Sequence, residues 1–127
     1  MYKILIIEDE KLLSEMYEEK FSQSGFSVMV ANSAEEGFES LKEYKPDLIL
    51  LDILLPQENG IQFLKRAKDI SGVSKIPVVV FSNYDDPETK KKASDLGARD
   101  YLIKTNFTPS EIVEKIKDFL KKLDTSR

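Results

Sequence analysis

Five short apolar runs separated by helical patterns constrain the fold most strongly. The runs are Ile4–Ile7, Phe26–Val30, Leu48–Leu51, Val78–Phe81 and Tyr101–Ile103. They consist mostly of Ile, Leu and Val without clean alternation, which is typical of strands buried on both faces of a parallel sheet. Because each run is short, its period alone does not distinguish a strand from a buried helix.

The segments between the runs have the spacing and the capping signals of helices. Leu13, Tyr17 and Phe21 recur every fourth residue, and Gly25 is a typical helix stop. Helix-capping residues with acids or proline in the first turn predict further starts. The four later helices are expected over residues 34–44, 59–67, 86–97 and 108–123.

Strands and helices therefore alternate along the whole chain, which predicts helices on both faces of a parallel sheet. We expect one doubly wound α/β domain over residues 1–123 and a frayed tail over residues 124–127. No linker, low-complexity tract or internal repeat interrupts the sequence. At 127 residues the chain has the size of one domain.

Composition removes several classes of function. The chain has no His and no Cys, which excludes Ser–His–Asp hydrolases, Cys nucleophiles and thiolate zinc sites. Its net charge of −4 argues against direct nucleic-acid binding. No apolar run approaches the roughly 18 residues of a membrane span. The early acids after residue 7 do not fit a signal peptide, so a cytoplasmic protein is expected.

Polar residues follow four of the five expected strands. Glu8 and Asp9 follow the first, Asp52 the third, Ser82 the fourth and Lys104 the fifth. Because sites in such sheets lie beyond the carboxyl ends of the strands, the predicted fold brings these side chains to one edge. Three neighbouring carboxylates repel one another, and Mg²⁺ would relieve that repulsion. With a lysine and a hydroxyl beside it, such a site suits phosphoryl transfer to a carboxylate nucleophile.

Each of these residues also has an ordinary structural interpretation when it is taken alone. Glu8 and Asp9 are consistent with a helix start, and Ser82 with a turn. Their convergence favours a functional site. The glycine-rich fingerprints of nucleotide-binding loops are missing from the sequence, and the stretch from Asp52 to Gly60 lacks the alternating acids of an EF-hand.

With these residues in hand, the chain resembles a response-regulator receiver domain of two-component signalling over essentially its full length. The resemblance rests on four motifs: ILIIEDE at residues 4–10, PDLILLDILLP at 46–56 with Gly60 after it, IPVVVFS at 76–82, and GARDYLIK at 97–104. It implies a flavodoxin-like five-stranded parallel sheet of order 2-1-3-4-5.

The resemblance also implies roles for individual residues. Asp52 would accept the phosphoryl group, Asp9 would bind Mg²⁺ directly and Glu8 through a water. The backbone carbonyl of Leu54 would complete the protein ligands, with Mn²⁺ as an acceptable substitute for Mg²⁺.

Ser82 and Lys104 would bind the phosphoryl group. Tyr101 matches the switch aromatic, and Asn83 would belong with Ser82 and Lys104 to the phosphoryl-binding and switch residues. Leu54 and Tyr84 would modulate hydrolysis.

Two residues depart from the family pattern. Asn83 stands where a small residue is usual and is expected to narrow access to Asp52. Thr105 follows the lysine where a proline joined through a cis bond is usual. These departures keep open the alternative of a degenerate receiver that is a constitutive interaction module. An aspartate-nucleophile phosphatase is the less favoured alternative, because its second acid would stand at Leu54.

The expected function is therefore that of a signalling switch rather than an enzyme, although it catalyses its own phosphorylation and a slow autodephosphorylation. A histidine kinase or histidine phosphotransfer domain would be the donor, and the signal would pass to a downstream protein through helix 4, strand 5 and helix 5. We expect no nucleic-acid or membrane contact, a monomer when unphosphorylated and at most a weak dimer when activated. A single-domain regulator and a piece of a longer protein both remain open.

Overall fold

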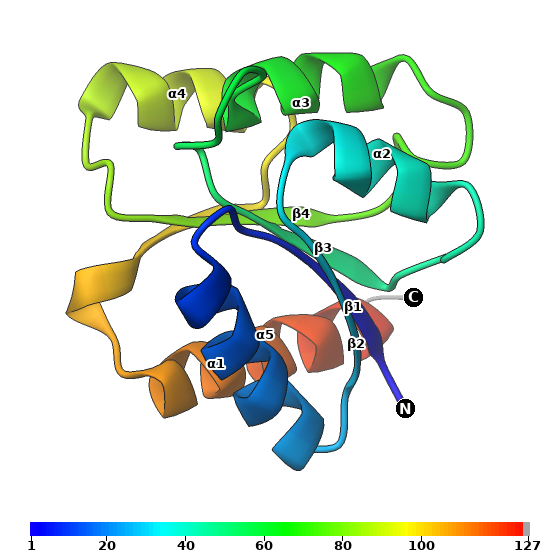
Figure 1. The fold of residues 1–127 in the computed structure, drawn as a ribbon, viewed down its shortest axis with the longest axis vertical. Helices are drawn as coiled ribbons and strands as arrows, with labels where there is room; N and C mark the ends of the chain where they lie inside the picture. Colours follow the sequence, from blue (N-terminus) through cyan, green and yellow to red (C-terminus); the bar gives the residue numbers. More distant parts are fainter. Residues whose placement is uncertain (126–127) are drawn as a thin grey trace.

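The computed structural model describes residues 1–125, in which five strands form one parallel sheet (Figure 1). The strands are β1 (Lys3–Ile7), β2 (Ser27–Ala31), β3 (Leu48–Leu51), β4 (Val78–Ser82) and β5 (Asp100–Ile103). Their order across the sheet is β2-β1-β3-β4-β5, and every neighbouring pair is parallel. The predicted fold class and strand order are confirmed.

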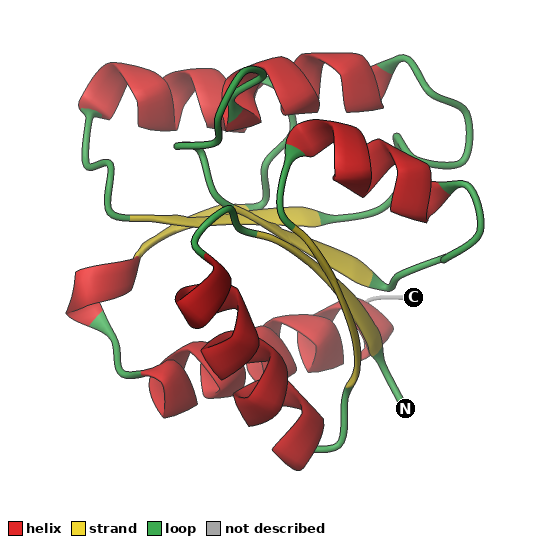
Figure 2. Ribbon diagram, viewed as in Figure 1, coloured by secondary structure: helices red, strands yellow, loops and turns green. Residues whose placement is uncertain are grey.

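Helices cover both faces of the sheet, as Figures 1 and 2 show. They are α1 (Lys11–Gln23), α2 (Ala34–Leu41), α3 (Gly60–Lys68), α4 (Pro87–Asp95) and α5 (Pro109–Thr125), with a short 3₁₀ turn η1 (Lys104–Asn106) before α5. Helices α2, α3 and α4 lie on one face, and α1 and α5 lie on the other. This arrangement leaves the ends of the strands free to carry a site.

The sheet separates two apolar cores. Along β1, Leu5 and Ile7 pack under α2 and α3, whereas Ile4 and Ile6 pack toward α1 and α5. All four side chains are fully buried. Burial of alternate residues on opposite faces explains why the strands are apolar throughout and show no alternation with polar residues.

Side chains cap four helices, and three of these caps, Ser33, Asp86 and Thr108, were predicted from the sequence. The Ser33 hydroxyl oxygen accepts from the Glu36 N–H, and the Asp86 carboxylate accepts from the Thr89 N–H. Reciprocal capping boxes join Asn59 with Gln62 at α3, and Thr108 with Glu111 at α5. Each bond satisfies N–H groups that have no partner inside the helix.

The expected end of the second helix and the expected start of the second strand were wrong. Helix α2 ends at Leu41 rather than near residue 44, because the next two N–H groups bond to carbonyls only three residues back, from Lys42 to Glu39 and from Glu43 to Ser40. Strand β2 begins at Ser27, since the Phe26 N–H instead bonds to the Phe21 carbonyl at 3.1 Å and closes α1. Gly25, at φ 94°, makes this reversal without steric cost.

Helix α5 continues to Thr125, two residues past its expected end at Leu123 and into the expected tail. The remaining part of that prediction, residues 126 and 127, lies outside the described residues.

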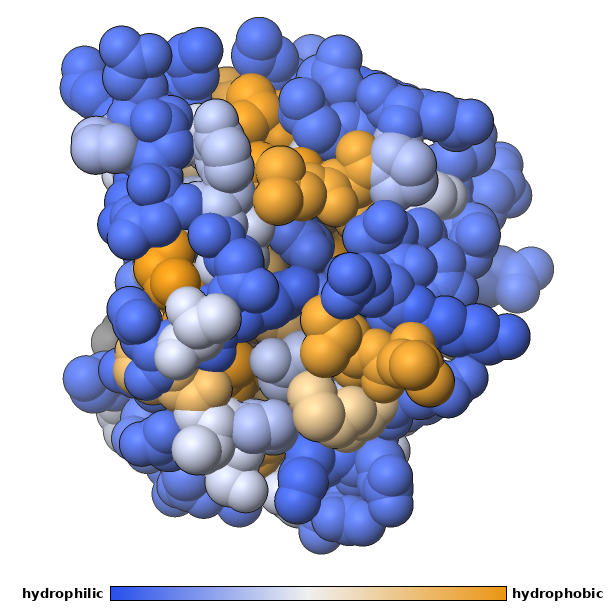
Figure 3. Space-filling model, turned by 60° about the vertical axis from the view of Figure 1, so that its left-hand side comes forward, coloured by the Kyte–Doolittle hydropathy of each residue, from blue (hydrophilic) through white to orange (hydrophobic). Residues whose placement is uncertain are grey.

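The surface view in Figure 3 shows hydrophobic side chains in separate patches between hydrophilic ones. The large apolar side chains that are most exposed belong to Met1, Leu12, Met29, Leu54 and Tyr84. Among residues 1–125, no helix has the length and apolar character that crossing a membrane requires.

Candidate functional site

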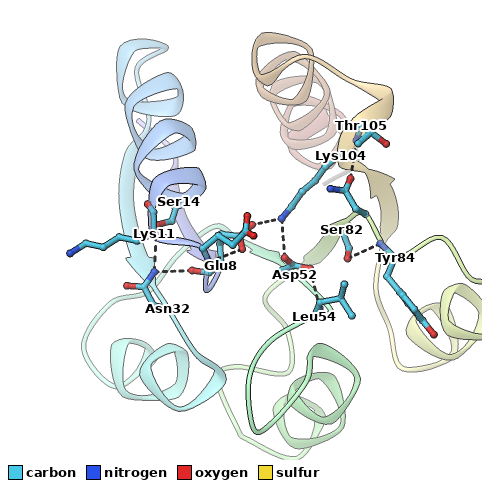
Figure 4. Close-up of polar contacts among 12 residues, drawn as sticks. Glu8, Lys11, Ser14, Asn32, Asp52, Leu54, Ser82, Tyr84, Lys104 and Thr105 are labelled. Carbon is cyan, nitrogen blue, oxygen red and sulfur yellow. Dashed lines mark hydrogen bonds and ion pairs between the residues drawn. The ribbon is translucent and has the colours of Figure 1, made fainter.

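Four strands bring the predicted residues to one edge of the sheet (Figure 4). Glu8 follows β1, Asp52 follows β3, Ser82 ends β4 and Lys104 follows β5. All four side chains are buried, with exposed fractions between 0 and 8%. Asp9, next to Glu8, is exposed. A group of buried polar side chains from strands far apart in sequence is costly to assemble, which makes this edge the candidate functional site.

Lys104 lies between the two buried carboxylates. Its Nζ is paired with Glu8 Oε1 and lies 2.9 Å from Asp52 Oδ2. The same ammonium group lies 4.7 Å from the ring centroid of Phe81, which adds a cation–π contact. The lysine therefore compensates the negative charge of Glu8 and Asp52 within the protein.

Burial and ion pairing have opposite effects on the pKa of Glu8, and also on the pKa of Lys104. Burial raises the pKa of Glu8, although the hydrogen bond and the charge of Lys104 oppose that rise. For Lys104, burial lowers the pKa, but Asp52 and Glu8 outweigh it and the pKa is raised overall. The raised pKa favours the positively charged form of Lys104 between the two carboxylates.

Three carboxylates at this edge fit a divalent cation. Glu8, Asp9 and Asp52 each offer an oxygen, and these oxygens lie within 4.8 Å of one another. Carboxylate oxygens in this number suit Mg²⁺, which binds one or two of them and retains several waters. The residues present therefore fit the metal that the sequence predicts. The role of the Leu54 carbonyl as a further ligand stays a prediction.

The backbone around Asp52 is held by close packing. The Leu54 N–H donates to Asp52 Oδ1 at 3.1 Å, and the Gly60 N–H donates to the Ile53 carbonyl at 2.9 Å. A Cβ atom at Gly60 would lie 2.7 Å from the Asp52 carbonyl oxygen and 2.7 Å from the Ile53 Cα. Only glycine allows α3 to start this close to the loop that carries Asp52.

Asn32, which was not among the residues predicted from the sequence, binds the acidic loop Glu8–Glu10 that follows β1. The Asn32 side-chain amide donates to the Glu8 carbonyl at 2.8 Å and approaches the Ser14 hydroxyl at 3.4 Å (Figure 4). Asn32 directly follows β2 and so lies at the same edge of the sheet as the other site residues. The sequence signal that points to Asn32 is therefore a polar residue directly after the second strand.

Three polar contacts involve Ser82, Asn83 and Tyr84, at the end of β4 and the start of the following loop. The Ser82 hydroxyl accepts from the Tyr84 N–H at 3.2 Å, and the Tyr84 carbonyl accepts from the Tyr101 hydroxyl at 2.5 Å. Asn83 Oδ1 accepts from the Thr105 N–H at 3.0 Å. The peptide bond between Lys104 and Thr105 is trans, as are the other peptide bonds of the described chain. Ser82 thus lies at the edge, with its hydroxyl turned to its own loop.

The fold and these side chains agree with comparisons against known proteins. Residues 4–117 match the model of the response regulator receiver domain family. The chain belongs to this family. Two curated relatives support the assignment: a phosphate regulon transcriptional regulatory protein of Escherichia coli, 37% identical over 121 residues, and an alkaline phosphatase synthesis transcriptional regulatory protein of Bacillus subtilis, 31% identical over 120 residues.

This receiver covers only part of those relatives. The alignments take in 95% and 94% of this chain but 52% and 49% of the two relatives, so it spans about half of their length. Among solved structures, a two-component response regulator from Clostridium difficile is 27% identical, with a TM-score of 0.88 and coverage of 97% and 98% of the two chains. A receiver domain protein from Methanospirillum hungatei has a TM-score of 0.90 at 24% identity, over 100% and 99%, and supports the fold alone.

Proposed function

We propose that Asp52 accepts a phosphoryl group from a phosphohistidine on a partner histidine kinase or histidine phosphotransfer domain. The observation that carries the proposal is the position of Asp52 between the ammonium group of Lys104 and the carboxylates of Glu8 and Asp9. Lys104 Nζ lies 2.9 Å from one of its oxygens, and the carboxylates of Glu8 and Asp9 lie within reach of a shared cation. This receiver would act as a switch that signals its phosphorylation state.

In the transfer step, a carboxylate oxygen of Asp52 attacks the phosphorus, and the bond between phosphorus and the imidazole nitrogen breaks. The electron pair of that bond stays on the histidine of the donor, and Asp52 becomes an acyl phosphate. Lys104 stabilises the negative charge of the phosphoryl oxygens. Asp9, Asp52, the Leu54 carbonyl and, through water, Glu8 would hold Mg²⁺ or Mn²⁺, which supplies additional charge neutralisation when bound.

After transfer, Ser82 would bind a phosphoryl oxygen. Its hydroxyl oxygen accepts from the Tyr84 N–H at 3.2 Å, and its O–H can donate to a phosphoryl oxygen at the same time. Tyr84 also accepts the hydrogen bond of Tyr101, so a movement of this loop reaches β5 directly. We propose that the resulting change of the α4, β5 and α5 face is recognised by a downstream protein.

The family and the charge of the domain support further proposals about its partners. The two curated relatives carry the words transcriptional regulatory protein in their names, and this receiver spans about half of each. With a net charge of −4, the domain itself would contact protein rather than DNA. We propose a cytoplasmic switch with a receiver over residues 1–123. It would be monomeric without phosphate and at most weakly dimeric with it. Light scattering with and without beryllofluoride tests the oligomeric state.

Phosphorylation of Asp52 is tested with acetyl phosphate and Mg²⁺, followed by mass spectrometry of the intact protein. The wild-type protein should gain one phosphoryl group, and Asp52→Asn should gain none. Asp118→Asn, a change of the same kind at an exposed position of α5, should label like the wild type. Equal labelling of Asp52→Asn and wild type would refute the assignment, and no labelling of the wild type would favour a constitutive interaction module.

A further inference from the structure

The two residues that depart from the family pattern bind each other. Asn83 lies directly after β4 and Thr105 lies in η1, directly after Lys104. The Thr105 N–H donates to the side-chain carbonyl oxygen of Asn83 at 3.0 Å, the contact marked at Thr105 in Figure 4. The bond depends on both departures, because a proline at position 105 would have no N–H and a small residue at position 83 would have no acceptor.

This bond connects the two segments that carry the phosphoryl-binding groups. Ser82 precedes Asn83, and Lys104 precedes Thr105, so one hydrogen bond joins the neighbours of both groups. A second bond, from the Tyr101 hydroxyl to the Tyr84 carbonyl, joins the same two segments one residue further along the loop. The loop after β4 is therefore bonded to η1 through Asn83 and to β5 through Tyr84.

We propose that Asn83 is a positioning residue for phosphoryl transfer. Its side chain clamps the loop after β4 to η1, and so holds Ser82 and Lys104 in a constant relation at the edge where Asp52 lies. The inference rests on the proposed phosphorylation of Asp52. It also reverses the expectation that Asn83 mainly obstructs access to Asp52, because a side chain bonded to Thr105 is directed at η1.

The clamp and the obstruction predict opposite effects of Asn83→Ala. Loss of a clamp disorders the phosphoryl-binding groups and slows transfer, whereas loss of an obstruction speeds it. For one net hydrogen bond between neutral groups we expect roughly fivefold slower phosphorylation by acetyl phosphate. Asn106→Ala removes an exposed amide from the same turn and is the matched control, with a rate close to that of the wild type.

A second measurement reads the clamp itself, without phosphodonor or Mg²⁺. Hydrogen exchange of the Thr105 amide, followed by NMR, should be roughly fivefold faster in Asn83→Ala than in wild type. Asn83→Asp retains the acceptor oxygen and should restore the protection. Because this arm needs no phosphorylation, its result is independent of whether Asp52 is the acceptor, which the Asp52→Asn experiment decides.

Slower phosphorylation together with a faster Thr105 exchange would support the clamp. The proposal is overturned if Asn83→Ala is phosphorylated as fast as the wild type or faster, or if the Thr105 amide exchanges equally fast in both proteins. Loss of protection in Asn83→Asp as well would also overturn it, because the acceptor would then not be the feature that matters.

Discussion

The hydroxyl group of Tyr101 donates a hydrogen bond to the backbone carbonyl oxygen of Tyr84, at 2.5 Å. This bond keeps the half-buried Tyr101 ring against the loop that follows β4. Burial, together with the nearby carboxylates of Asp52 and Asp85, raises the pKa of Tyr101 to about 12. The folded protein therefore favours the neutral, hydrogen-bonding form of this side chain.

Because the pKa of Tyr101 is higher in the folded than in the unfolded protein, the free energy of unfolding should fall at high pH. The ordinary pKa of tyrosine is 10.0, so the contribution of neutral Tyr101 is fully present below pH 10.0 and is lost as the pH rises through about 12. We expect the free energy of unfolding of the wild type to fall over this range more steeply than that of Tyr101→Phe. Urea denaturation of both proteins across the range measures the difference, and parallel curves would contradict it.

Removal of Lys104 should destabilise the fold because it leaves Glu8 and Asp52 buried without their common partner. For Lys104→Met we expect a loss of about 3 kcal/mol in the free energy of unfolding. Mg²⁺ should restore more stability to this variant than to the wild type, because a bound cation replaces the missing charge. Urea denaturation with and without Mg²⁺ tests both statements.

Lys117→Met is the matched control for that experiment. The Lys117 ammonium lies 3.9 Å from Glu114 on the outside of α5. Its loss should change the stability by no more than about 0.5 kcal/mol, with no dependence on Mg²⁺. A Lys104→Met protein as stable as this control would show that the buried pairs are not important for folding.

Asp9 should contribute more to Mg²⁺ affinity than Glu8. Both Glu8 oxygens already have partners, Oε1 with Lys104 and Oε2 with the Glu10 N–H, whereas Asp9 is exposed. We expect Asp9→Ala to weaken Mg²⁺ binding about tenfold, or ~1.4 kcal/mol, and Glu8→Gln to weaken it less. Isothermal titration calorimetry compares the two, and the reverse order would be evidence against Asp9 as the direct ligand.

Phosphorylated Asp52 should hydrolyse slowly in the wild type. Leu54 and Tyr84 are 53% and 42% exposed and line one groove of about 380 Å³ beside the site. Leu54 has no polar side-chain group to orient a water for attack on the phosphorus. We expect Leu54→Asn/Tyr84→Glu to release phosphate about tenfold faster, equal to ~1.4 kcal/mol in the barrier.

Phosphate release from the purified phosphoprotein measures this rate. Met29→Asn, an exposed apolar side chain on β2 changed to the same amide, serves as control and should match the wild type. If the double variant releases phosphate no faster than the control, positioning of the water by these two side chains does not set the rate.

The sequence by itself determined which strands and helices form and where most of the helices start. Ser33, Asn59, Asp86 and Thr108 cap helices with bonds that span three residues, so their signals are local and are read directly from the chain. The apolar runs likewise determined the strands, because a strand covered on both faces has to be apolar at every position. The residue types at the strand ends predicted the buried polar residues that the structure brings to one edge, but not Asn32, which also lies there.

Where local hydrogen bonds compete closely, the sequence was less informative. The end of α2 depends on whether the N–H groups after Leu41 bond three or four residues back, and the lysine before Pro46 limits only how far the helix extends. Residue types near position 42 do not distinguish the two patterns.

Only the tertiary structure decided which site residues contact each other. Lys104 and Glu8 are 96 residues apart, and their pairing depends on the strand order that places β5, β4, β3 and β1 along one edge. The bonds from Asn32 to Glu8 and from Thr105 to Asn83 depend in the same way on strand ends meeting in space. Hydrogen bonds and ion pairs of this kind act over about 3 Å, so the folded positions of distant segments determine them and local sequence does not.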